Sequence, residues 1–146
     1  MTCTFFGHSS VSRETLIPLT KVLTNLIENK GVDTFYVGNH GGYDRMVRDK
    51  LREMKKKYPH IDYKVVLAYI PTKKDEYEDY SETLYPSVLD GVPYRARIVT
   101  RNERMIKKSD YVVTYVEQNI GGAAKSKEKA EKEGKKVINL AEFKEG

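Results

Sequence analysis

Apolar and polar positions along this chain follow two periods, one typical of buried strands and one typical of amphipathic helices. Short apolar runs mark the strands. Between them, apolar residues recur every three or four positions, as in the stripe Tyr43, Val47, Leu51, Met54 and Tyr58, which predicts a helix. The expected strands are residues 4–6, 34–37, 64–70, 111–116 and 136–140, and the expected helices are residues 16–27, 43–58, 100–108 and 122–133.

This alternation predicts a single α/β domain covering residues 1–146. The run at residues 64–70 is almost wholly apolar, as in a parallel sheet covered on both faces. We therefore expect a three-layer Rossmann-like sandwich with a central, mainly parallel five-stranded sheet. Right-handed crossovers bring the carboxyl ends of the strands to one edge, where such folds bind ligands.

The rhythm breaks at residues 71–96, a segment rich in tyrosine and acidic residues, with prolines at 86 and 93. A loop of this length in a compact domain is usually functional. We expect it to cover the site of its own chain or to complete the site of a neighbouring copy.

Two glycine-rich turns follow expected strands and open expected helices. The first is YVGNHGGYD, residues 36–44, and the second is YVEQNIGGAAK, residues 115–125. Glycines allow a phosphate to approach the backbone closely, and the first amides of a helix point at the bound anion. Two such turns at one edge of a sheet indicate a nucleotide-like ligand.

The candidate ligand-binding residues all lie at the expected carboxyl edge. Asp44 can cap its helix or bind a ribose hydroxyl, and Arg101 can hold a phosphate or form a surface salt bridge. Tyr69 can stack on a base or belong to the core. The full set is Gly7, His8, Ser9, Gly38, Asn39, His40, Gly41, Gly42, Asp44, Tyr69, Arg101, Asn102, Gly121, Gly122, Ala123 and Lys125.

Several cofactor classes fit the sequence poorly. The turn at residues 38–44 has neither a Walker lysine nor the GxGxxG pattern, and the next strand lacks the acidic residue expected for a dinucleotide ribose, so ATP hydrolysis and dinucleotide redox chemistry are not expected. His8 and His40 lack a third ligand at zinc-site spacing. We expect neither a metal nor a cofactor.

The net charge of +5 favours an anionic partner only weakly, because the lysines are spread over expected helix surfaces. Nucleic acid therefore stays a secondary possibility. No apolar run approaches the roughly 20 residues that span a bilayer. The single cysteine, Cys3, and the lack of a secretory pattern predict a cytoplasmic protein, with Cys3 packed as a small hydrophobic residue.

Taken together, these motifs resemble the small stand-alone members of the SLOG superfamily, named for the SMF/DprA and Lonely-guy proteins. The resemblance covers almost the whole chain, through FFGH, YVGNHGGYD, VVLAYIP, RNERMI, SDYVVTYVEQNIGGAAK and KKVINL. It implies a Rossmann-like sheet, nucleotide-derived ligands and a dimer or a higher assembly.

The Lonely-guy branch cleaves N-glycosidic bonds of nucleoside monophosphates, using a helix arginine and a PGGxGTxxE turn. Gly121, Gly122 and Glu128 match that turn, whereas Ile120, Ala124 and Lys125 depart from it. The resemblance thus implies nucleotide binding, as a sensor or a sequestering protein. The alternatives are an N-glycoside hydrolase or ribosyl transferase with Glu128 and Arg101 as catalytic residues, and a protein that binds single-stranded nucleic acid.

Overall fold

A six-stranded parallel sheet with helices on both faces forms the core of the computed structural model, which describes residues 1–70 and 80–143. The strand order is β4-β3-β2-β1-β5-β6. The strands are β1 (Thr2–Gly7), β2 (Thr34–Val37), β3 (Asp62–Val66), β4 (Thr83–Leu84), β5 (Tyr111–Tyr115) and β6 (Lys136–Asn139).

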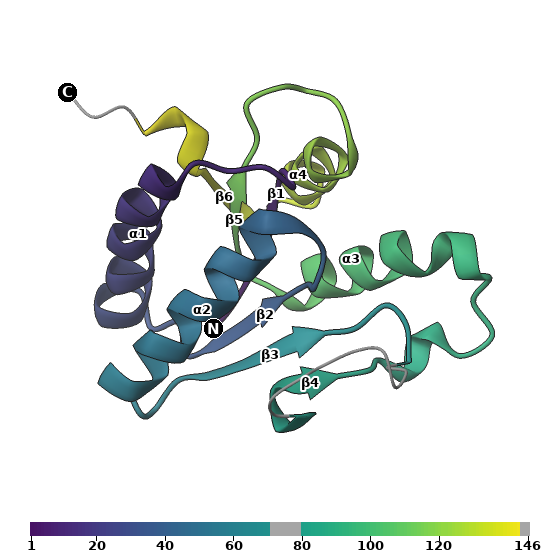
Figure 1. Ribbon diagram of the computed structural model, residues 1–146, viewed down its shortest axis with the longest axis horizontal. Coiled ribbons are helices and arrows are strands. Elements are labelled where there is room, and N and C mark those ends of the chain that lie inside the picture. The colour runs from purple at the N-terminus through teal and green to yellow at the C-terminus, as the bar shows by residue number, and fades with distance from the viewer. Residues whose placement is uncertain (71–79, 144–146) are drawn as a thin grey trace.

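Two layers of helices cover the sheet (Figure 1). The helices α1 (Leu16–Asn29) and α2 (Gly41–Lys57) pack on one face, around Phe5, Phe35 and Val113. On the other face lie α3 (Arg97–Lys108) and α4 (Gly122–Lys132), packed around Phe6, Val66 and Val112. Because successive strand residues point to opposite faces, Phe5 and Phe6 enter different cores. The expected three-layer Rossmann-like sandwich is confirmed.

The expectation of five strands is wrong by one. The additional strand is β4, which lies in the segment expected to be a long loop. It pairs with β3 through Val65–Thr83 and Val66–Leu84. A two-residue strand has no periodicity for the sequence to reveal. Around it the segment forms short 3-10 turns, η2 (Tyr80–Glu82), η3 (Ser87–Leu89) and η4 (Tyr94–Ala96), while residues 71–79 lie outside the described part.

A partly buried ion pair between Arg52 and Glu82 holds the β4 region against α2. Arg52 donates from Nε and Nη2 to the two carboxylate oxygens of Glu82, at 2.7 and 2.6 Å, and the Tyr63 hydroxyl donates to the same carboxylate. A bidentate arginine–carboxylate pair is geometrically specific as well as strong. The crossover that leads to α3 is therefore anchored before it reaches the carboxyl edge.

The expected element boundaries shift by a few residues. The third strand ends at Val66 instead of residue 70, and α3 begins at Arg97 instead of residue 100. Pro18 occupies the third position of α1, where no intrahelical donor is needed, and a 3-10 turn, η1 (Arg13–Thr15), precedes it. Cys3 is fully buried in the core, as expected, and burial raises the pKa of its thiol.

Strand order reverses between β1 and β5, which both lie in the middle of the sheet. Chain segments leaving these two strands diverge to opposite faces, so a crevice opens at their carboxyl ends.

In the described ranges, no helix is long and apolar enough to cross a bilayer.

The closest approach of α2 to the sheet depends on Gly7 at the end of β1. A Cβ atom at residue 7 would lie 2.3 Å from the ring of Tyr43, a fully buried side chain whose hydroxyl donates to the Val113 carbonyl at 2.9 Å. Glycine at this position thus lets α2 pack directly over the end of β1.

We expect Gly7→Ala to lower the free energy of unfolding by about 1–3 kcal/mol, because the new methyl group would overpack against Tyr43. Gly122→Ala is the matched control, since a Cβ there meets no atom within 4 Å. Urea unfolding of both variants checks this. Equal stabilities would contradict the close packing of Gly7.

Candidate functional site

A cleft of about 290 Å³ lies at the carboxyl edge of the sheet, beside the point where strand order reverses. Loops leaving β1 and β2 form one side, and α3 with the start of α4 forms the other. Most of the expected ligand-binding residues line it: Gly7, His8, Ser9, Gly38, His40, Asp44, Arg101, Asn102, Gly121, Gly122 and Ala123.

Arg101 lies at the bottom of this cleft and is only 2% exposed. Its Nη1 donates to the side-chain oxygen of Asn39 at 2.8 Å and to the Val66 carbonyl at 3.3 Å, and lies 3.2 Å from Nδ1 of His40. Its Nε donates to Asn102 at 3.1 Å. Neutral groups therefore orient the guanidinium, and within the described ranges it forms no ion pair with a carboxylate.

The second terminal nitrogen of Arg101, Nη2, donates to no described residue. Burial lowers the pKa of Arg101, while the charges of Asp44 and Tyr69 act in the opposite direction. An arginine stays protonated under these conditions. The cleft is thus lined by a buried positive charge that has one nitrogen without an acceptor among the residues described.

Asp44, in the first turn of α2, accepts the backbone amide of His40, the N-cap residue, at 3.0 Å. Burial raises the pKa of its carboxyl group to about 6, although the His40 amide and the charge of Arg101 both favour the ionised form. Between Asp44 and Arg101 lies Gly38, where a Cβ would come within 2.8 Å of the carboxylate and 3.2 Å of the guanidinium. Only glycine fits between them.

His40 joins Arg101 to the outer part of the site. Its Nδ1 accepts from Arg101, so the ring proton of the neutral form is on Nε2. Burial, followed by the charge of Arg101, lowers the pKa of His40. The ring is therefore neutral at physiological pH. Its other neighbour is Tyr69, whose ring lies edge-on at a centroid distance of 6.3 Å.

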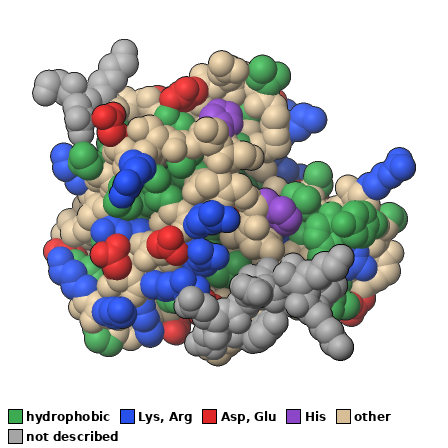
Figure 2. Space-filling view, in the orientation of Figure 1, with side chains coloured by type: hydrophobic (Ala, Val, Ile, Leu, Met, Phe, Trp, Pro, Cys, Tyr) green, Lys and Arg blue, Asp and Glu red, His purple; other side chains and the backbone are tan. Residues whose placement is uncertain are grey.

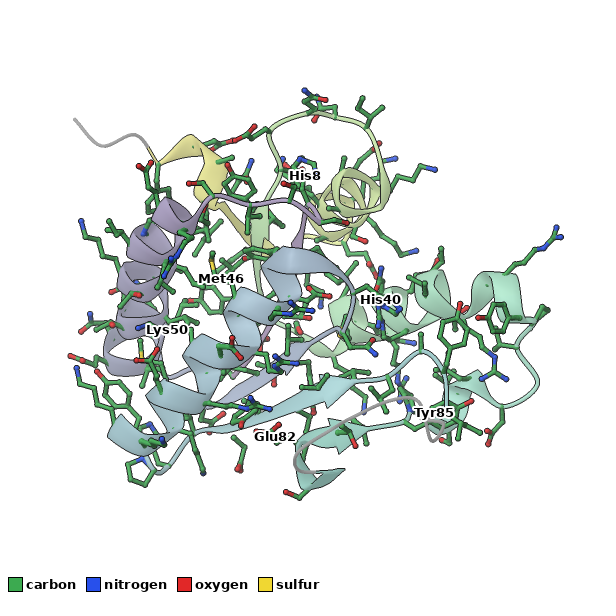
Figure 3. All side chains as sticks on the ribbon, viewed as in Figure 1. His8, His40, Met46, Lys50, Glu82 and Tyr85 are labelled. Atoms are coloured by element: carbon green, nitrogen blue, oxygen red, sulfur yellow. The ribbon has the colours of Figure 1, made fainter. Side chains whose placement is uncertain are left out.

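His8 lies on the β1 side of the cleft and connects the two central strands. Its backbone amide donates to the Tyr115 carbonyl at 3.1 Å, and its Nε2 accepts the Glu117 amide at 2.9 Å. Figure 3 shows His8 and His40 on the loops that leave the sheet at this same edge. His8 therefore fixes the loop that forms the mouth of the cleft.

The two glycine turns differ in what they contact. Gly41 and Gly42 pack on Ser9: the Gly42 amide donates to the Ser9 carbonyl at 2.7 Å, and Gly41 has a φ of 89°. They dock the loop after β1 and do not line the cleft. Gly121 and Gly122, by contrast, line the cleft and face open space.

The N-terminus of α4 presents backbone donors at this opening. No side chain caps it, and its first intrahelical bond runs from the Lys125 amide to the Gly121 carbonyl. The amides of the first helical residues have no intrahelical acceptor. With the helix dipole, they favour an anion at the mouth of the cleft.

Some expected residues lie elsewhere. Asn39 is behind Arg101, Tyr69 is beyond His40, and Lys125 is exposed on α4 without lining the cleft. Glu128 has a side chain that is 66% exposed, pairs with Lys132 at 3.0 Å and does not line the cleft. No group of three metal-ligating side chains occurs among the residues described.

The cleft also has an apolar wall that the motifs did not indicate. It consists of Phe6, Ile98 and Met105, and Phe5, whose side chain belongs to the opposite core, borders it from β1. Ile98 and Met105 are seven positions apart and flank Arg101 on the same face of α3. The expected start of the helix at residue 100 left Ile98 outside it; an earlier start would have revealed this spacing.

A wider hollow of about 700 Å³ lies between α1 and the 3-10 turn η5 (Leu140–Glu142). Its charged residues, Glu14, Lys21 and Glu117, are exposed and of mixed sign. It therefore offers less to an anion than the smaller cleft, where a cation is buried.

Comparison with known proteins gives no match to any protein-family model and none to a curated protein.

We expect the raised pKa of Asp44 to make stability depend on pH. Its pKa is higher in the folded state, about 6, than the ordinary value of 3.8, so folding favours the protonated form. Its contribution is complete below the ordinary pKa and is lost as pH rises through about 6; the difference is about 3 kcal/mol at most. His40 acts in the opposite direction, so the measured quantity is the difference between wild type and Asp44→Asn.

Chemical denaturation of both proteins between pH 4 and 8 checks this. Relative to the variant, the wild type should gain stability as the pH falls from 7 to 4. Parallel curves would show that Asp44 titrates normally.

Proposed function

We propose that this protein binds a nucleotide or a nucleotide-derived small molecule, such as an ADP-ribose-like or cyclic nucleotide, at the carboxyl edge of its sheet. The observation that carries the proposal is the buried Arg101, which lines the cleft, is held by neutral groups and has no acceptor for Nη2 among the described residues. A phosphate oxygen would accept from Nη2 and from the first amides of α4.

The remaining walls suit the rest of such a ligand. Asp44 offers a carboxylate oxygen for a sugar hydroxyl, and the apolar wall around Phe6 and Met105 can contact the face of a ribose. The cleft volume of about 290 Å³ is near the lower end for ligand pockets, so it accommodates a phosphorylated sugar more readily than a whole dinucleotide.

Binding without cleavage is the form of the proposal that the geometry supports best. The hydrolase alternative requires Glu128 at the ribose, yet this side chain is exposed and paired with Lys132 outside the cleft. A role as sensor or sequestering protein needs only the cleft. If cleavage does occur, Glu128→Gln should abolish it and spare binding.

The first experiment measures thermal stability with nucleoside monophosphates, ADP-ribose, cyclic ADP-ribose isomers and cyclic dinucleotides, followed by chromatography of each mixture. A ligand at 100 times its Kd adds about 2.7 kcal/mol to the stability of the fold, which raises Tm. We expect at least one ligand to raise Tm and to be recovered intact. Recovery of free base and ribose phosphate would establish the hydrolase instead.

Arg101→Lys should weaken this binding by roughly tenfold or more, because lysine cannot reproduce the planar fork of donors. Arg104→Lys makes the same change one turn along α3, outside the cleft, and should bind as wild type. Titration calorimetry of the ligand that gives the largest Tm shift measures both.

Gly122→Asp tests the helix terminus separately. Its Cβ has free space, and an acidic residue stabilises a helix N-terminus, so folding should be kept. The added negative charge should nevertheless repel the phosphate. Unchanged affinity in both Arg101→Lys and Gly122→Asp would overturn the proposal.

A further inference from the structure

A pair of stacked tyrosines lies just outside the cleft. The rings of Tyr69 and Tyr94 are 4.4 Å apart at their centroids and inclined by 28°, and the Tyr69 hydroxyl donates to the Tyr94 carbonyl at 3.3 Å. Tyr69 follows β3, and Tyr94 begins the turn before α3. Two segments far apart in the sequence thus form one aromatic platform.

The outer ring of this platform is open to solvent, since Tyr94 is 72% exposed. Two more exposed apolar residues lie nearby in the sequence: Ile70 directly follows Tyr69, and Val99 is five positions after Tyr94. Figure 2 shows hydrophobic side chains gathered beside a histidine on this face of the molecule. An exposed apolar patch of this kind, next to a polar cleft, is typical of a binding site.

His40 makes the platform continuous with the cleft. Nδ1 of its ring lies 3.2 Å from Nη1 of Arg101. The same ring packs edge-on with the ring of Tyr69, at a centroid distance of 6.3 Å. Arg101, His40, Tyr69 and Tyr94 therefore form an unbroken series from the buried cation to the surface. A ligand with its phosphate at Arg101 would leave the cleft along this series.

We propose that the open face of Tyr94, backed by Tyr69, is the subsite on which the base of the nucleotide stacks. This inference rests on the proposed function and specifies its ligand: a nucleotide with an unblocked planar base, as opposed to a bare sugar phosphate. A base stacks on an aromatic ring through its π-face, so purines, with the larger face, should bind more tightly than pyrimidines.

Among the described residues, the platform itself contributes only two tyrosine hydroxyls as polar side-chain groups. Tyr94 makes no side-chain hydrogen bond to another described residue, and Tyr69 directs its hydroxyl to the backbone. The platform therefore selects for the presence and the size of a base ring.

The test compares ribose 5-phosphate with AMP and UMP by titration calorimetry, on wild type, Tyr94→Ala and Tyr94→Phe. We expect Tyr94→Ala to weaken AMP binding by roughly 5- to 100-fold, the range for loss of one base–aromatic stack. Ribose 5-phosphate should change by less than twofold. Tyr94→Phe keeps the ring and should bind AMP about as tightly as the wild type. Tyr58→Ala, at the far end of α2, is the control.

The possible outcomes distinguish failure of the stacking subsite from failure of the proposed nucleotide binding. If AMP and ribose 5-phosphate bind the wild type equally and Tyr94→Ala alters neither, the stacking subsite is wrong and the anion site stands. If neither ligand, nor any nucleotide of the wider panel, binds the wild type, both proposals are wrong. If Tyr94→Ala instead dissociates an oligomer in sedimentation without changing the ratio of the two affinities, the patch is an interface between copies.

Discussion

One buried charge organises this end of the molecule. The guanidinium of Arg101 is removed from water, so each of its donors needs an acceptor or a compensating charge. The fold supplies acceptors from three directions: the loop after β2, the end of β3 and the neighbouring position on α3. These contacts fix where α3 lies over the sheet. The shape of the cleft therefore follows from how one cation is accommodated.

Small residues around that charge make the arrangement possible. Gly38 lets Asp44 and Arg101 approach each other, and Gly7 lets α2 descend onto the end of β1. The glycines that the sequence suggested as phosphate contacts thus divide into two groups. Those after β2 serve the packing of protein against protein, whereas Gly121 and Gly122 leave open space at a helix terminus. A motif alone does not distinguish these uses.

The sequence predicted the layered architecture well, because strand and helix periods are local and strong in this chain. It also placed most of the cleft residues, because the carboxyl ends of parallel strands meet at one edge whatever the details of packing. It missed β4, which has only two residues and depends on pairing with β3. It could not show that Glu128 turns away from the cleft, because that depends on the rotation of α4 about its own axis.

Asp44 and Arg101 lie close together without forming an ion pair, an arrangement that costs the fold stability and that the proposed ligand would offset. A direct carboxylate pair would satisfy the cation and leave little attraction for a ligand. Here the carboxylate is committed to the His40 amide, and burial raises its pKa. The fold is thus less stable than it would be if these two charges formed a direct ion pair. A phosphate at Nη2 would relieve this cost on the cationic side, so binding gains free energy that folding alone leaves unused.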